Sequence, residues 1–97
     1  MARIIPSSES LTVEFKSDLK KYPDSDIFEA VVAFANTEGG SLYLGVEDNG
    51  QITGVHPSHK NPITLSAFVA NNTVPPVSTR AEIIDDEKPV LQISVPK

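Results

Sequence analysis

The chain contains several short stretches in which hydrophobic and polar residues alternate, and two in which hydrophobic residues recur at helical spacing. Residues 11–16 (LTVEFK) alternate strictly, which predicts a half-buried strand with Leu11 on its inner face. The apolar period then changes to that of a helix, so we expect a helix from about 26 to 37. The turn-forming sequence before it offers Asp24 or Ser25 as the N-cap.

A double glycine follows this predicted helix. Gly39 or Gly40 can end the helix, because glycine readily adopts the left-handed conformation found at many helix ends. The alternating residues 41–48 predict a second strand. Asp48-Asn49-Gly50 is typical of a tight hairpin turn whose central positions have positive φ, and it predicts a return strand at 51–55.

The second half of the chain predicts one more helix and two more strands. Asn61 is a suitable cap and Pro62 a suitable first-turn residue for a shorter helix that ends at about Asn71. Its expected inward positions are Ile63, Leu65, Phe68 and Val69. Two prolines then end any helix, and strands are expected at 78–84 and 89–95, joined by an acidic turn.

These elements predict an α+β fold with the order β-α-β-β-α-β-β and a mixed or antiparallel sheet covered by helices. The length of 97 residues fits one domain over residues 1–97, either a complete small protein or the N-terminal part of a longer one with further C-terminal domains. The predicted core contains Phe15, Ile27, Val31, Phe34, Leu42, Leu44 and Val46.

Composition and charge narrow the classes of function. No apolar run approaches the roughly 20 residues that cross a bilayer, so we expect no membrane association and a cytoplasmic location. With no cysteine, the chain has no thiolate nucleophile and no cysteine-bound zinc. Its net charge of −5 means that binding to a nucleic acid needs a local basic patch, for which the candidates are Lys16, Lys20 and Lys21.

Several catalytic patterns are missing from the sequence. There is no GxGxxG or GK[ST] motif, and the double glycine follows a helix C-terminus, where the helix dipole repels phosphate. No GxSxG motif supports a hydrolase. His56 and His59 lie in a proline-containing loop with no third ligand nearby, so we interpret them as ordinary loop residues rather than a metal pair.

Carboxylates offer a further kind of chemistry. Glu9, Glu14 and Asp48 could hold a divalent cation that positions water against a phosphodiester. Glu9 and Glu14 can meet only if the chain bends near Ser10, because five residues of a straight strand span about 16 Å and reverse the face. Asp48 also has a simpler interpretation as the residue that opens a hairpin turn.

The segments ESLTVEFK at 9–16 and AFANTEGGSLYLGVEDNGQITGV at 33–55 resemble the Schlafen-type Alba-like domain. PPVSTRAEII and KPVLQISVP fit the later part of the same pattern, so the resemblance covers nearly the whole chain. It implies an α+β fold and the DNA-binding role assigned to this module in bacterial transcriptional regulators and RecG-helicase-related proteins. The arginine-glycine-serine element that usually follows in the family is absent here.

The resemblance also bears on individual residues. In Schlafen proteins that cleave RNA, the family's acidic triad falls at the positions of Glu9, Glu14 and Asp48. Asn36 and Thr37, at the end of the predicted helix, could present donors to a ligand or fix the hairpin.

Three functions therefore remain open. The leading one is binding of DNA or RNA, with DNA favoured and no cofactor required. The second is cleavage of RNA with Mg²⁺ or Mn²⁺ by the three carboxylates. The third is homodimerisation through an exposed final strand, LQISV.

Overall fold

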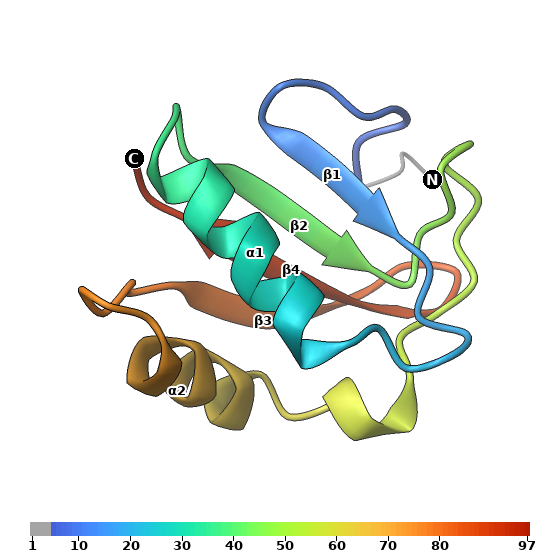
Figure 1. Cartoon of the computed structure of the whole chain (residues 1–97). Helices are drawn as coiled ribbons and strands as arrows, with labels where there is room; N and C mark the ends of the chain where they lie inside the picture. Colours follow the sequence, from blue (N-terminus) through green and yellow to red (C-terminus); the bar gives the residue numbers. More distant parts are fainter. Residues whose placement is uncertain (1–4) are drawn as a thin grey trace.

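A computed structural model of the chain describes residues 5–97 and contains four strands and two α-helices in one layer each (Figure 1). The elements, in chain order, are β1 (Val13–Lys16), α1 (Asp24–Ala35), β2 (Gly40–Leu44), the short 3-10 helix η1 (Pro57–His59), α2 (Pro62–Asn72), β3 (Arg80–Asp85) and β4 (Pro89–Val95). The predicted α+β class is confirmed, and so is the element order, with the predicted strand at 51–55 reduced to a single bridge. No helix of the described residues is long and apolar enough to cross a membrane.

The sheet is mixed and has the order β1-β2-β4-β3. β1 pairs with β2 in parallel, whereas β2 with β4 and β3 with β4 are antiparallel. The sequence LQISV belongs to β4, which lies inside the sheet and is paired on both sides. The prediction that LQISV is an exposed strand available to a second copy is therefore wrong, because its backbone groups are already used.

Helix α1 departs from its predicted ends. Pro23 is the N-cap and makes no side-chain capping bond, so Asp24 lies inside the first turn instead of capping it. The helix ends at Ala35, two residues earlier than predicted. Gly39 closes it as expected, with φ of 76° and its N–H donating to the Phe34 carbonyl at 2.8 Å.

The segment after β2 is the main local difference from prediction. Ile52 forms only an isolated bridge opposite Val46, so residues 51–55 add no full strand to the sheet. The expected tight turn is present, with the Gly50 N–H donating to the Glu47 carbonyl at 2.8 Å. Of the Asp48-Asn49-Gly50 segment, only Gly50 has the positive φ that was predicted, at 89°. A turn of this kind leaves the return segment less closely paired with β2.

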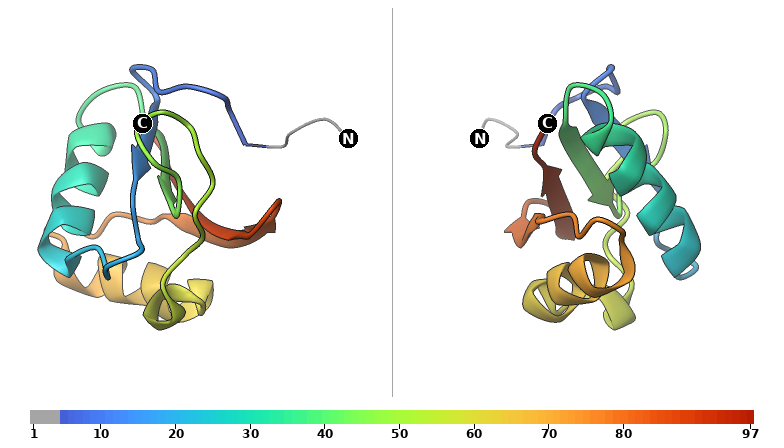
Figure 2. Two further views of the ribbon diagram at one scale, coloured as in Figure 1. Left: turned by 90° about the vertical axis from the view of Figure 1, so that its right-hand side faces the viewer. Right: turned by 60° about the vertical axis from the view of Figure 1, so that its left-hand side comes forward.

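Hydrophobic residues cover both faces of the sheet. Both helices pack on one face, as Figure 2 shows, around a cluster that includes Val31, Leu44 and Leu91. The opposite face carries a smaller cluster around Phe15 and Tyr43, whose rings meet edge to face at 6.0 Å. All seven predicted core residues are buried: Phe15, Ile27, Val31, Phe34, Leu42, Leu44 and Val46.

Three predicted inward positions are exposed. Leu11 is 92% exposed because β1 begins only at Val13 and the preceding residues form a turn. Ile63 is 81% exposed and Phe68 is 37% exposed, so the buried residues of α2 are Leu65 and Val69. The capping prediction for α2 is confirmed, since the Asn61 side chain accepts a bond from the Thr64 N–H at 3.1 Å.

Candidate functional site

The carboxyl ends of the two parallel strands carry the first group of candidate residues. The Lys16 ammonium, at the end of β1, lies 3.1 Å from the Glu14 carboxylate. The hydrogen bond with Glu14 raises the pKa of Lys16 above its usual 10.5, and the charge of Asp48 acts in the same direction. Lys16 is therefore paired with Glu14 and is not a free cation.

The other two candidate lysines differ from Lys16. Lys20 and Lys21 lie in the loop between β1 and α1, and both side chains are exposed. Neither forms an ion pair within the described residues. These two ammonium groups are consequently available to an anionic ligand, whereas Lys16 must first leave Glu14.

Glu9 does fold back toward β1 as the metal hypothesis requires. Ser10 and Val13 exchange backbone hydrogen bonds of 3.0 and 3.3 Å, which makes the sharp turn expected near Ser10. The Glu9 carboxylate then accepts a bond of 2.9 Å from the Phe15 N–H. Because β1 is at the edge of the sheet, this contact satisfies an amide that would otherwise face solvent.

The three carboxylates of the predicted acidic triad are not arranged as a metal site in the described part of the chain. Among residues 5–97, no three Asp, Glu or His side chains are arranged so that they could hold a metal ion, and this includes Glu9, Glu14 and Asp48. Glu9 is instead bonded to a backbone amide and Glu14 to Lys16. A cation at this position would have to replace both of these contacts.

A pocket on the surface adjoins Glu14. It measures about 440 Å³, lies between β1 and α1, and is lined by the carboxylates of Glu14, Asp26 and Glu29 together with exposed Leu11. Its lining, drawn from the described part of the chain, contains no Lys or Arg. This surface therefore repels phosphate and separates the basic loop from the far end of α1.

Asn36 and Thr37 lie at that far end. Asn36 is the C-cap of α1, and the Thr37 hydroxyl donates to the Ala33 carbonyl at 3.0 Å. The 12 residues of α1 span roughly 18 Å at 1.5 Å per residue, so these two side chains are well separated from Lys20 and Lys21. The fold does not bring together all the residues predicted to contact nucleic acid.

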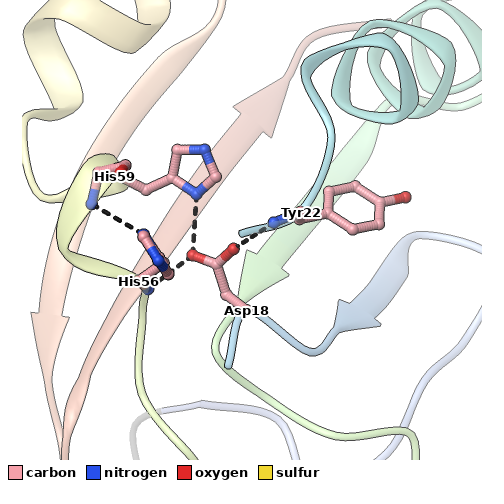
Figure 3. Close-up of polar contacts among 5 residues, drawn as sticks. Asp18, Tyr22, His56 and His59 are labelled. Carbon is pink, nitrogen blue, oxygen red and sulfur yellow. Dashed lines mark hydrogen bonds and ion pairs between the residues drawn. The ribbon is translucent and has the colours of Figure 1, made fainter. Parts of the chain in front are cut away.

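A buried polar cluster was missed by the sequence analysis (Figure 3). Asp18 is fully buried, and its carboxylate accepts bonds from the Tyr22 N–H at 2.8 Å and the His56 N–H at 2.7 Å. His59 Nδ1 lies 2.8 Å from the same carboxylate. His59 is only 3% exposed, so its interpretation as an ordinary loop residue is wrong.

This cluster connects two loops that are distant in sequence. Because an ionised carboxylate can only accept hydrogen bonds, the geometry places a proton on His59 Nδ1. The ring's other nitrogen, Nε2, is buried and has no hydrogen-bond partner among the described residues. The only sequence signal was the HPSH motif itself, since Asp18 lies 41 residues away and no local pattern relates the two.

Comparison with known proteins identifies the domain. The Schlafen, AlbA_2 family model matches residues 9–97, which is nearly the whole chain. The chain belongs to the Schlafen AlbA_2 family. The match begins at Glu9, the residue that folds back on β1, and it confirms the resemblance found in the sequence.

A solved structure gives a second comparison for this Schlafen AlbA_2 domain. The chain is similar to the solution NMR structure of the N-terminal domain of a RecG-related protein from Nitrosomonas europaea, with 27% identity and a TM-score of 0.53. The match covers 92% of this chain and 65% of that chain. The Schlafen AlbA_2 domain thus spans about two thirds of the length of that N-terminal domain.

Proposed function

We propose that this Schlafen AlbA_2 domain is a nucleic-acid-binding module, with DNA as its preferred ligand. The observation that carries the proposal is the β1–α1 loop, which presents Lys20 and Lys21 as exposed, unpaired cations. Lysines of this kind bind phosphate by displacing counterions. Family membership and the similarity to a RecG-related protein support the same class of ligand.

The charge distribution limits how such binding occurs. The domain carries a net charge of −5, and the groove beside the basic loop is lined by three carboxylates. Binding through the loop is therefore local, weak and sensitive to salt, because only a few phosphates are neutralised. We expect a larger protein to provide the remaining affinity through domains beyond this chain, as in a transcriptional regulator or a RecG-related protein.

The proposal is tested by fluorescence binding titrations with duplex DNA, single-stranded DNA and structured RNA of matched length. Saturable binding with duplex DNA the tightest ligand is the expected result. A Lys20→Ala, Lys21→Ala double variant should weaken it, whereas a Lys88→Ala, Lys97→Ala double variant, which removes two exposed positive charges elsewhere, serves as the matched control. Absence of saturable binding to all three ligands at low salt would contradict the proposal. If RNA binds most tightly, the preference for DNA is wrong and RNA is the preferred ligand.

A metal-dependent ribonuclease is the second candidate, and the turn at Ser10 is the observation that favours it. This turn brings the Glu9 carboxylate to the backbone next to Glu14. In this proposal, Mg²⁺ or Mn²⁺ displaces Lys16 and draws Asp48 inward. Millimolar metal should then raise the melting temperature of the native chain but not of a Glu14→Gln variant, and structured RNA should be cleaved. Equal melting temperatures with and without metal, and intact RNA, would exclude it.

A further inference from the structure

A small pocket beside the buried Asp18–His59 pair contains the strongest unexplained feature of the molecule. It measures about 180 Å³ and lies where the β1–α1 loop meets η1 and the first turn of α2. His59 is part of its lining, and the buried Nε2 of this histidine has no partner among residues 5–97. A buried polar atom without a hydrogen bond is costly unless something outside the chain satisfies it.

The lining groups favour a particular kind of ligand. Lys21, Ser58 and Thr64 line the pocket, and their side chains carry an ammonium group and two hydroxyls. The first turn of α2, an 11-residue helix, also borders the pocket and contributes the positive end of its dipole, although its Thr64 N–H is already capped by Asn61. Ammonium, hydroxyl and helix N-terminus are the groups with which proteins bind phosphate.

His59 completes this set through its bond to Asp18. The carboxylate contacts Nδ1 and so orients the ring, which leaves the buried Nε2 as the nitrogen without a partner in a residue that lines the pocket. A phosphate oxygen would accept a hydrogen bond from an N–H at Nε2, the donor that this nitrogen presents when both ring nitrogens carry a proton. The orphan nitrogen would then be satisfied.

We propose that this pocket binds a single phosphate group, contacted by Lys21 and by His59 Nε2. The inference deepens the proposed function, since it assigns one phosphate contact to a defined place in the basic loop. The group could belong to the backbone of a nucleic acid or to a free phosphate monoester, and the chemistry of recognition is the same. Asp24 also lines the pocket, and its negative charge opposes the ligand.

Nuclear magnetic resonance of the 97-residue chain labelled with ¹⁵N tests the proposal, with inorganic phosphate as the probe. Ionic strength is held constant with chloride so that general salt effects are removed. Phosphate should cause saturable shifts in the amides of Ser58 and Thr64 and in the ring Nε2 of His59. Shifts that rise linearly without saturation, or that spare these signals, would overturn it.

Charge variants around the pocket make the test sharper without disturbing the buried pair. Lys21→Gln should weaken phosphate binding at least threefold, and Asp24→Asn should tighten it. Lys88→Gln, an exposed lysine in the turn between β3 and β4 and outside the pocket lining, is the matched control and should leave the binding curve unchanged. An equal loss in Lys88→Gln and Lys21→Gln would overturn the assignment of the pocket.

Two further probes identify the source of the phosphate. A short single-stranded oligonucleotide without a terminal phosphate presents only phosphodiesters, and a nucleoside monophosphate presents only a monoester. A shift of the His59 Nε2 signal with either probe supports the phosphate pocket. The probe that causes the shift shows whether the ligand is a phosphodiester or a phosphate monoester. If duplex DNA binds the chain but no probe changes the His59 Nε2 signal, the assignment of a phosphate to this pocket is refuted. The proposed function is unaffected by that result.

Discussion

His59 Nδ1 lies 2.8 Å from Asp18 Oδ2, and both side chains are almost completely buried. The pair joins the loop after β1 to the loop that precedes α2, and the Asp18 carboxylate also binds the backbone N–H groups of Tyr22 and His56. One carboxylate therefore fixes the positions of two loops, including the loop that carries Lys20 and Lys21.

Replacing this carboxylate should destabilise the domain strongly. We expect Asp18→Asn to lower the free energy of unfolding by about 3 to 5 kcal/mol, because the amide cannot accept from all three donors and His59 loses its partner. Urea unfolding measures the change, and Asp85→Asn, at an exposed end of β3, is the control. A loss below about 1 kcal/mol would show that the pair contributes little to stability.

Glu9 should act on the edge of the sheet even without metal. Its carboxylate accepts the bond from the Phe15 N–H, so Glu9→Ala should speed hydrogen exchange of that amide by about tenfold, which corresponds to the loss of one hydrogen bond of about 1.4 kcal/mol. Glu38→Ala, which removes only an exposed ion pair with Lys97, should leave the amide unaffected. Equal exchange in the two variants would refute the capping role.

Gly45 should tolerate no side chain. Its φ is 104°, and a Cβ atom there would lie 2.6 Å from the carbonyl carbon of Gly54, which is backbone and cannot move aside. Gly54 has a similar φ of 96°, but a Cβ atom there meets only Lys88 at 3.4 Å. Both alanine variants place a side chain at a positive φ and lose stability for that reason. A larger drop in melting temperature for Gly45→Ala than for Gly54→Ala therefore measures the additional effect of the backbone contact. Equal losses would contradict the close approach.

Alkaline pH should destabilise the fold. Burial raises the pKa of Tyr43 above its ordinary value of 10.0, and the bond with Glu14 raises the pKa of Lys16 above 10.5. The folded state therefore keeps protons that the unfolded chain releases, so this stability is complete below about pH 10 and is lost as the pH rises through the folded pKa values. Urea unfolding at about pH 8 and 11 measures the loss, which Tyr43→Phe should reduce. A stability that rises with pH would reverse the expected sign.

The sequence predicted the fold where local patterns determine structure. Strict alternation and helical spacing located the helices and most strands, and every predicted core residue from Phe15 to Val46 is buried. Leu11 was placed wrongly because alternation cannot distinguish the first residue of a strand from a turn that precedes it. The segment at 51–55 followed the period of a strand, but its turn geometry leaves a single bridge.

The candidate site was less accessible to prediction, because its important contacts are distant in sequence. The turn near Ser10 was stated as a condition of the metal hypothesis, whereas the bond from Glu9 to a backbone amide was not anticipated. Pairing of Lys16 with Glu14 follows from their two-residue spacing on one strand face, which the pattern contained. The Asp18–His59 pair spans 41 residues and required the folded structure.

Phosphate contact by the basic loop is tested most directly by the salt dependence of duplex DNA binding. The slope of log affinity against log salt should fall by about two units in the Lys20→Ala, Lys21→Ala double variant, since each lost phosphate contact removes about one unit. Lys16→Ala should change the slope by less, because Glu14 already holds that ammonium at 3.1 Å. An unchanged slope in the double variant, or a larger effect of Lys16→Ala, would contradict binding through the β1–α1 loop.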